Sequence, residues 1–289
     1  MRKLNLTEPT TRQADLAFSK RTYVMGVLNV TPDSFSDGGK FLDKSKAIEH
    51  AIDMAAAGAD MIDVGGVSTR PGARDVSIDE ELGRVIPVLE NLSKVIKIPI
   101  SIDTRRSRVA EEAIRGGVSI VNDISGLRHD PAMAPVVARH GAAVIIMQMK
   151  GEPQNMQLNP AYKNLIEELI AFFRESINIA RDAGVQEEKI IIDPGIGFGK
   201  TVEHNLEILN RLDEFKILGR PICIGTSRKS FIGKILDVSE PGDRLIGTLA
   251  TCVIAVMKGA NILRVHDVKE TLQAARMTDS ILKSKIKNL

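Results

Sequence analysis

The stretch VMGVLNVTPDSFSDGG, residues 24–39, contains the transition that decides the fold. Five of its first seven residues are apolar, as in a buried strand. The stretch then becomes abruptly polar, with side chains at Asn29, Thr31, Asp33, Ser34, Ser36 and Asp37. A single transition of this kind would be an ordinary turn, whereas a repeated one would indicate strands that all end at one functional face.

The transition recurs along the chain. Short apolar runs rich in β-branched residues begin near residues 23, 59, 98, 119, 142, 189, 221 and 260, which predicts eight strands. Apolar spacing near 3.6 predicts helices between them, over residues 46–57, 80–95, 109–115, 165–183 and 249–258. Several of these segments end at a glycine, as expected of a helix C-cap: Gly58, Gly116, Gly141, Gly184 and Gly259.

Strict alternation of strands and helices predicts parallel strands covered by helices. Eight such units in 289 residues fit an α/β fold, a single (β/α)8 TIM barrel. Residues 1–20 would then be a short N-terminal extension and residues 21–289 the barrel domain. A doubly wound open sheet is the alternative fold.

The composition excludes several functional classes. An apolar fraction of 43% and a charged fraction of 26% argue against a disordered chain. Lys and Arg outnumber Asp and Glu by only 39 to 37, which argues against nucleic acid or an anionic membrane as a partner. The sequence has neither a signal peptide nor an apolar run of about 18 residues, so we expect a cytoplasmic protein. Cys223 and Cys252 lie in apolar surroundings and are expected to be buried, reduced thiols.

Every predicted strand ends in side chains capable of chemistry. One such residue would be read as a helix cap or turn former, but eight polar ends at one barrel mouth indicate a binding site. Carboxylate and amide acceptors there suit a planar heterocycle rich in N–H donors, and cations near the last two strands suit phosphate. The predicted cavity is therefore acidic at its base and cationic at its rim. The strand ends carry Asn29, Asp63, Asp103, Asn122, Gln148, Asp193, Lys229, Arg264 and His266.

The glycine-rich loop DPGIGFGKT, residues 193–201, fits no standard nucleotide motif. A P-loop needs glycine where Pro194 stands, and the spacing of the three loop glycines fails the dinucleotide pattern. The loop is either a flexible turn or a place where backbone approaches a flat ligand, with Phe198 as an apolar wall. The long loops at 31–41 and 65–75 are likewise open to two interpretations, a mobile lid or ordinary solvated loops.

The motifs GVLNVTPDSFSDGG, DVGGVSTRPGA, SIDT, VNDIS, DPGIGFGK, SRKSFIG and RVHDV occur here in the order and spacing of the bacterial dihydropteroate synthases. The chain resembles that pterin-binding family over about residues 23–270. The resemblance implies a transferase of folate biosynthesis that joins 6-hydroxymethyl-7,8-dihydropterin diphosphate to para-aminobenzoate. The products would be 7,8-dihydropteroate and pyrophosphate, and sulfonamides would compete for the aminobenzoate place. The resemblance also implies Mg2+ as cofactor and a homodimer formed through outer barrel helices.

The same resemblance assigns roles to individual residues. The pterin would be bound by Asp103, Asn122, Asp193 and Lys229. The diphosphate would be bound by Asn29, Thr69, Arg264 and His266, with Asn29 also a ligand of Mg2+. Para-aminobenzoate would lie among Phe35, Thr69, Arg70, Pro71, Phe198 and Ser230, the last of which would open a helix. The expected catalytic residues are Asn29, Arg70, Lys229, Arg264 and His266.

None of these residues looks like an activated covalent nucleophile. The expected chemistry is departure of pyrophosphate from the pterin methylene, followed by attack of the neutral aryl amine. Two positions depart from the family pattern: Val67 stands where glutamate is usual, and Gln148 where many members have histidine. Two other functions stay open, a pterin-dependent methyltransferase serving a corrinoid protein and a pterin-binding module without catalysis.

Overall fold

The strands close into a parallel barrel in the computed structural model, which describes residues 21–31, 40–68, 72 and 76–284. The sheet order is β6-β5-β4-β3-β2-β1-β8-β7, and a bridge from Ile192 to Ile222 joins its two edges. The predicted TIM barrel is therefore confirmed, and the open sheet is excluded. The expected extension, residues 1–20, lies outside the described residues. The strands are β1 (Tyr23–Asn29), β2 (Met61–Gly65), β3 (Ile100–Asp103), β4 (Ile120–Asp123), β5 (Ala143–Met147), β6 (Ile190–Asp193), β7 (Cys223–Ile224) and β8 (Ile262–Val265).

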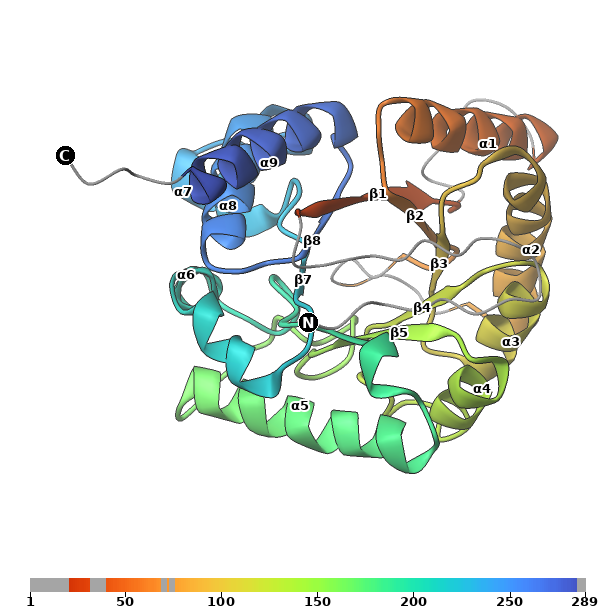
Figure 1. Cartoon of the computed structure of the whole chain (residues 1–289), viewed down its shortest axis with the longest axis horizontal. Helices are drawn as coiled ribbons and strands as arrows, with labels where there is room; N and C mark the ends of the chain where they lie inside the picture. Colours follow the sequence, from red (N-terminus) through yellow and green to blue (C-terminus); the bar gives the residue numbers. More distant parts are fainter. Residues whose placement is uncertain (1–20, 32–39, 69–71, 73–75, 285–289) are drawn as a thin grey trace.

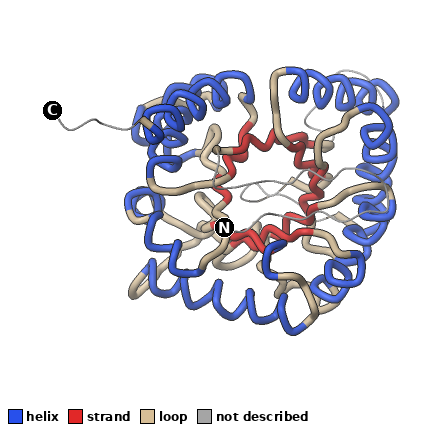
Figure 2. Tube along the Cα trace, viewed as in Figure 1, coloured by secondary structure: helices blue, strands red, loops and turns tan. Residues whose placement is uncertain are grey.

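Helices surround this ring of strands (Figures 1 and 2). The predicted helices are confirmed, and four of them begin earlier than the apolar periodicity suggests. In α2, for example, the N-cap Ser77 accepts a hydrogen bond from the Glu80 N–H at 3.1 Å, so a polar first turn precedes the apolar face. The α-helices are α1 (Lys40–Ala56), α2 (Ile78–Val95), α3 (Ser107–Arg115), α4 (Met133–His140), α5 (Leu165–Asp182), α6 (Val202–Asn210), α7 (Ser230–Leu236), α8 (Leu245–Met257) and α9 (Val268–Lys283). Short 3-10 helices are η2 (Glu187–Lys189), η3 (Leu212–Leu218) and η4 (Pro241–Arg244).

Alternation along the strands divides the core into two parts. One set of strand residues packs outward against the helices in the larger hydrophobic cluster. The other set points into the barrel and forms an apolar plug there, made of Tyr23, Met25, Met61, Ile120, Ala143, Ile145, Ile191, Cys223 and Ile262. Because side chains alternate, the next inward positions on these strands lie nearer the C-terminal mouth of the barrel.

Glycines with positive φ follow several helices, as the sequence predicts. Gly58, Gly141, Gly184 and Gly259 have φ values of 100°, 62°, 93° and 104°. After α3, Gly116 is the C-cap, as predicted, with a φ of −78°, and the left-handed residue is the following Gly117, with a φ of 100°. α3 thus ends at Arg115, as the sequence predicts, and the left-handed residue directly follows its C-cap.

Two further expectations can be compared with the structure. Cys223 and Cys252 are both buried free thiols, as predicted. Within the described ranges, none of the helices combines the length and the apolar character that a membrane crossing needs.

Candidate active site

A layer of polar side chains points into the barrel directly above the apolar plug. Each comes two residues after another inward side chain of the same strand, as strand alternation requires. Asp63, Asn122 and Asp193 are 0%, 3% and 5% exposed. Asp103 and Asn122 are direct register partners on neighbouring strands. We call this set the polar layer; it contains Asp63, Asp103, Asn122, Asp193 and Arg264.

Arg264 connects the members of the polar layer. Its Nε donates to Asp63 Oδ2 at 2.6 Å, and its Nη2 donates to Asp103 Oδ2 at 2.7 Å. Asn122 Nδ2 donates to the same Asp63 oxygen at 2.9 Å. Arg264 therefore lies among the carboxylates, and the predicted separation of an acidic base from a cationic rim is wrong for this residue. The physical reason is that buried carboxylates on neighbouring strands need a counter-charge.

Burial sets the charge states around the polar layer. It raises the pKa of Asp103 to about 7, although Arg264 pulls that pKa down. It also raises the pKa of Asp193, against the opposing effect of Lys229. The pKa of Lys229 itself is lowered by burial to about 8. Perturbed groups facing one cavity are typical of a site that binds a ligand or performs catalysis.

Lys229 meets the glycine-rich loop at the edge of the polar layer. Its ammonium donates to the carbonyl oxygen of Ile196 and lies 4.5 Å from the centre of the Phe198 ring. A Cβ at Gly197, where φ is 82°, would lie 3.0 Å from Lys229 Cδ. The ammonium of Lys229 and the Phe198 ring of the loop therefore lie on the same side of the barrel mouth.

The same loop packs closely against the chain that follows β5. A Cβ at Gly195, where φ is 69°, would lie 1.9 Å from the Gln148 carbonyl oxygen. A Cβ at Gly199 would lie 2.3 Å from the carbonyl oxygen of Lys150. The Gly195 N–H donates to Asp193 Oδ1 at 2.7 Å. These two glycines are thus required by contact between two segments of backbone, a reason that neither interpretation of the loop anticipated.

Lys200 is a buried residue that the sequence analysis missed. It is 3% exposed, and its Nζ donates to Gln148 Oε1 at 2.6 Å and to the Phe198 carbonyl oxygen at 3.0 Å. Its hydrogen-bond partners in the described part of the chain are neutral oxygens, and burial lowers its pKa to about 7. The available signal was the Gly-Lys-Thr sequence, which was tested only as a phosphate-binding motif.

Two other predicted residues line the mouth from β8 and α7. His266 Nδ1 lies 3.0 Å from Ser227 Oγ, within hydrogen-bond distance. Ser230 is the first residue of α7, as expected, and borders a cavity of about 530 Å³. Lys200, Glu203 and Lys234 line the same cavity, so its walls carry ionisable groups of both signs.

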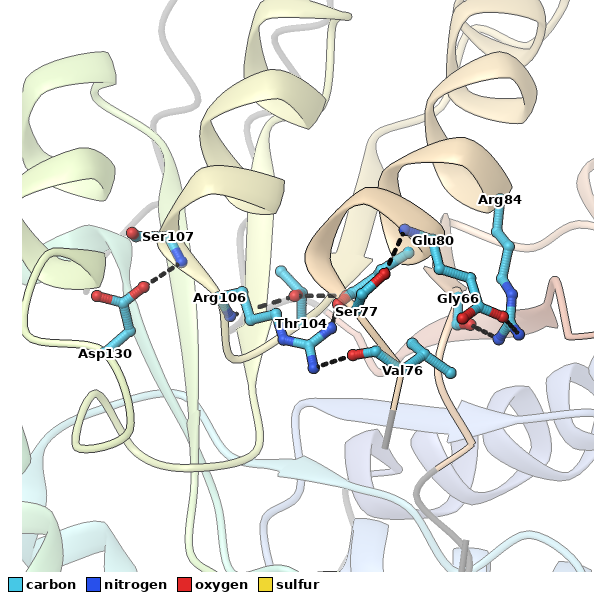
Figure 3. Close-up of polar contacts among 10 residues, drawn as sticks. Gly66, Val76, Ser77, Glu80, Arg84, Thr104, Arg106, Ser107 and Asp130 are labelled. Carbon is cyan, nitrogen blue, oxygen red and sulfur yellow. Dashed lines mark hydrogen bonds and ion pairs between the residues drawn. The ribbon is translucent and has the colours of Figure 1, made fainter. Parts of the chain in front are cut away.

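Two arginines hold the ends of the loop between β2 and α2 (Figure 3). Arg84 Nη1 donates to the Gly66 carbonyl oxygen at 2.8 Å, and Arg106 Nη2 donates to that of Val76 at 2.5 Å. Glu81, which is 2% exposed, accepts from Arg106 Nη1 at 2.7 Å. Both ends of the loop are therefore fixed to α2 and to the turn after β3, another feature that sequence alone did not reveal.

Four predicted site residues, Phe35, Thr69, Arg70 and Pro71, lie outside the described residues. Asn29 ends β1 and is partly exposed. A Cβ added at Gly65 would lie 3.8 Å from Asn29 Oδ1 and 3.8 Å from Asp103 Oδ2. Both oxygens therefore lie next to Gly65, at the end of β2. Over the described ranges, no group of three or more His, Cys, Asp or Glu side chains is arranged to hold a metal ion.

Comparison with known proteins agrees with the geometry of the site. Residues 25–266 match the family model of pterin binding enzymes. The dihydropteroate synthase of Synechocystis sp. is 51% identical, over 91% of this chain and 91% of its own length. The crystal structure of the Clostridium difficile dihydropteroate synthase, determined in the presence of pteroic acid, has a TM-score of 0.88 at 53% identity and covers 93% of this chain and 99% of that one. The Yersinia pestis enzyme in complex with a sulfonamide drug has a TM-score of 0.89 at 42% identity, covering 96% and 100% of the two chains.

Proposed function

The chain belongs to the family of pterin binding enzymes, within its dihydropteroate synthases, and we propose how its own residues carry out their reaction. That reaction condenses 6-hydroxymethyl-7,8-dihydropterin diphosphate with para-aminobenzoate, giving 7,8-dihydropteroate and pyrophosphate. The chain is thus a transferase of folate biosynthesis that acts on small-molecule substrates. Sulfonamides are the inhibitor class of its aminobenzoate site.

The observation that carries the proposal is the buried polar layer in the barrel mouth. Its carboxylate and amide acceptors suit the N–H donors of a pterin ring, and charge-assisted hydrogen bonds of this kind are worth roughly 1.5–3 kcal/mol each. Asp103, Asn122 and Asp193 hold the donor edge of the ring. Lys229 donates to the carbonyl side, and the Phe198 ring beside it adds an apolar wall.

The diphosphate extends from Arg264 in the polar layer toward the rim, and Asn29, Thr69, Arg264 and His266 bind it. Two nitrogens of Arg264 are hydrogen-bonded to carboxylates, and Nη1 serves a phosphate oxygen. The contact between His266 and Ser227 holds the imidazole in position to donate to the leaving pyrophosphate.

Mg2+ fits the diphosphate end of the site. The ion prefers hard oxygen ligands and usually takes most of them from substrate phosphates and water. Asn29 supplies an amide oxygen near the Asp103 carboxylate. One such protein ligand is enough to hold Mg2+ when the diphosphate and water supply the remaining oxygen ligands. When bound, the ion neutralises negative charge on the departing pyrophosphate.

Para-aminobenzoate binds on the outer side of the pterin, against Phe198 and Ser230. Ser230 borders the cavity of about 530 Å³, and its hydroxyl can donate a hydrogen bond to the carboxylate. The remaining walls of this pocket are assigned to residues that lie outside the described ranges: Phe35, Thr69, Arg70 and Pro71.

The protein contributes positioning and leaving-group stabilisation rather than a nucleophile of its own. An aryl amine is already nucleophilic in its neutral form, so a strong base is not required. Holding the amine in line with the pterin methylene converts a bimolecular encounter into an intramolecular step, and proximity effects of this kind lower reaction barriers by at most roughly 7–11 kcal/mol. Arg264, His266 and Lys229 stabilise the negative charge that develops on the pyrophosphate as it departs.

Pyrophosphate release by the purified protein tests this function. With both substrates and Mg2+, one pyrophosphate should appear for each dihydropteroate formed. Omission of para-aminobenzoate should strongly slow the release, because no amine is then present to capture the pterin methylene after pyrophosphate departs. A protein that bound the pterin but released no pyrophosphate in the complete mixture would overturn the proposal in favour of a methyltransferase or a non-catalytic module.

We also propose that the chain forms a homodimer through α8 and α9. On α8 the apolar residues Ile246, Ile254 and Met257 are 75%, 44% and 56% exposed and recur at helical spacing. On α9, Met277 and Ile281 are 63% and 58% exposed. The two helices pack side by side (Figure 1), so these residues form one apolar face, as a self-complementary interface requires.

Light scattering at micromolar concentration tests the dimer. Ile246→Glu places a charge in this apolar face at its most exposed residue and should shift the mass to that of a monomer. Val95→Glu is a matched control, because Val95 is 56% exposed at the end of α2, on a different side of the barrel (Figure 1). A wild-type protein that ran as a monomer would contradict the proposal.

The domain boundaries and the cellular location are proposals of the same kind. Residues 21–289 form one barrel domain, a proposal supported by the packing of α9 against β1, which joins the end of the fold to its beginning. A cytoplasmic location is supported by the two buried free thiols, since a reducing compartment keeps such cysteines unpaired.

A further inference from the structure

Asp63 is a fully buried carboxylate that none of the roles above uses. Its strand, β2, is the middle one of five neighbours in the order β4, β3, β2, β1 and β8. We propose that Asp63 is a positioning residue that fixes the hydrogen-bonding orientation of Asn122 and Arg264 in the pterin site. The inference rests on the proposed function and assigns to that site a residue that acts through its neighbours.

The first consequence of Asp63 concerns the Asn122 amide. An ionised carboxylate only accepts hydrogen bonds, so Asn122 must direct its NH2 group toward Asp63. The Nδ2 to Oδ2 distance of 2.9 Å agrees with this orientation. Asn122 Oδ1 is buried and finds no hydrogen-bond partner among the described residues. Asp63 thereby presents Asn122 to the ligand as an acceptor, which is what a ring edge rich in N–H donors requires.

The second consequence concerns the plane of the Arg264 guanidinium. Nε is bound to Asp63 on β2 and Nη2 to Asp103 on β3, at 2.6 and 2.7 Å. Because the guanidinium is planar and rigid, two anchored nitrogens fix its orientation. Because Arg264 also bonds to Asp63, it uses only one of its nitrogens on Asp103. The second oxygen of Asp103 is then available to a ligand.

Asp63→Asn is the variant that isolates this role. It keeps the size of the side chain and removes the charge, and the new amide can donate as well as accept. The Asn122 amide is then no longer held in one orientation. Titration calorimetry with unphosphorylated 6-hydroxymethylpterin should show binding weaker by at least about tenfold. The KM for para-aminobenzoate, measured at saturating pterin diphosphate, should change by less than about twofold, because Asp63 contacts the pterin side of the site.

Asp123→Asn is a matched control on β4, which β3 separates from β2. Asp123 is also fully buried, but its carboxylate accepts hydrogen bonds from the Ser125 and Leu127 N–H groups of its own turn, at 2.8 and 3.0 Å. Removing this charge should lower stability and leave pterin affinity within about twofold. Equal losses of affinity in the two variants would mean that Asp63 acts only through the stability of the barrel, which would overturn the inference.

A double-mutant cycle tests the connection to Asn122 directly. Asn122→Ala should cost pterin affinity in the wild-type background and distinctly less in the Asp63→Asn background, because the two residues act as one unit. Additive losses would overturn the inference. If Asp63→Asn does not fold, Asp63→Glu replaces it: the charge is kept, the carboxylate moves by one methylene, and unchanged pterin affinity would again overturn the inference. A wild-type protein without pyrophosphate release would instead overturn the proposed function.

Discussion

The Arg264 guanidinium on β8 and the Asp103 carboxylate on β3 form an ion pair inside the barrel, with Nη2 and Oδ2 at 2.7 Å. The same guanidinium bonds to Asp63, so Arg264→Ala leaves two buried carboxylates without their shared counter-charge. We expect the affinity for unphosphorylated 6-hydroxymethylpterin to fall by at least about tenfold, as measured by titration calorimetry.

His266→Ala supplies the comparison for this prediction. His266 contacts Ser227 rather than the polar layer, so its removal should weaken binding of the pterin diphosphate and leave the unphosphorylated pterin within about twofold. If Arg264→Ala also spared the unphosphorylated ligand, Arg264 would serve the diphosphate alone, and the ion pair would have no part in pterin recognition.

The second prediction concerns the pH dependence of pterin binding. Burial raises the pKa of Asp103 to about 7, and the ionised carboxylate, which only accepts hydrogen bonds, can accept from Arg264 on one oxygen and from an N–H of the ring on the other. Affinity for the unphosphorylated pterin should therefore be full at high pH and fall as the pH drops through about 7. Calorimetric titrations across this range measure the effect, and Asp103→Asn should bind weakly with a flat profile. A wild-type profile that stayed flat down to about pH 5 would contradict this account, because Asp103 would then either stay ionised over the whole range or bind the ring equally well in its neutral form.

The same shift affects folding with a definite sign. The folded-state pKa of Asp103 lies above its ordinary value of 3.8, so the folded protein holds this proton more tightly than the unfolded chain. The contribution of Asp103 to stability is complete below the ordinary value and is lost as the pH rises through about 7. The ionised carboxylate that we propose as the ligand acceptor is therefore maintained at the expense of stability.

The third prediction concerns Asn29 and Mg2+. If Asn29 is the protein ligand of the ion, Asn29→Ala should weaken binding of the pterin diphosphate when Mg2+ is present. With EDTA, wild type and variant should bind this ligand equally, because the ion that connects it to Asn29 is gone. Titration calorimetry under both conditions makes the comparison. Equal weakening with and without EDTA would assign Asn29 a direct contact with the diphosphate instead.

The sequence was sufficient for the fold and for much of the polar layer. Apolar strands alternate with helical segments along the whole chain, and a two-residue period places Asp103, Asn122 and Asp193 on the inner face once a barrel is assumed. Asp63 obeys the same rule on β2, two residues after Met61, and could have been assigned to the layer by counting.

The direction of Arg264 could not be read from the sequence. Its position at the end of the last strand suggested a phosphate contact, but its guanidinium lies between carboxylates of β2 and β3, which only closure of the barrel brings near β8. Lys200 was missed for a similar reason. Its burial depends on contact between two loop backbones, and nothing in local periodicity encodes that contact.

The fourth prediction uses Lys200 as a probe of stability. Burial among neutral oxygens lowers its pKa from 10.5 to about 7, so the unfolded chain binds this proton more tightly than the folded one. Stability should therefore rise with pH between about 7 and 10.5. Lys200→Met removes the group, and the urea midpoint of the variant should rise less over this range than that of wild type. Lys234→Met, at an exposed position in the wall of the same cavity, is the control and should keep the wild-type slope.

The last prediction separates backbone strain from steric contact at Gly195. Alanine there would adopt a φ of 69°, and its Cβ would lie 1.9 Å from the Gln148 carbonyl oxygen. Gly219 has a similar φ of 61° with no atom within 4 Å of the Cβ position, so Gly219→Ala measures the strain alone, about 1 kcal/mol.

Gly195→Ala should cost that strain and roughly 1–3 kcal/mol more, because the two segments of backbone must move apart. The Gly195 N–H holds Asp193 Oδ1 at 2.7 Å, so the movement also displaces a carboxylate of the pterin site. Urea unfolding and pterin titration of both variants test this account: Gly195→Ala should lose stability and affinity together, whereas Gly219→Ala should lose only a little stability. Equal effects of the two substitutions would show that the contact with the chain after β5 does not hold Asp193 in place.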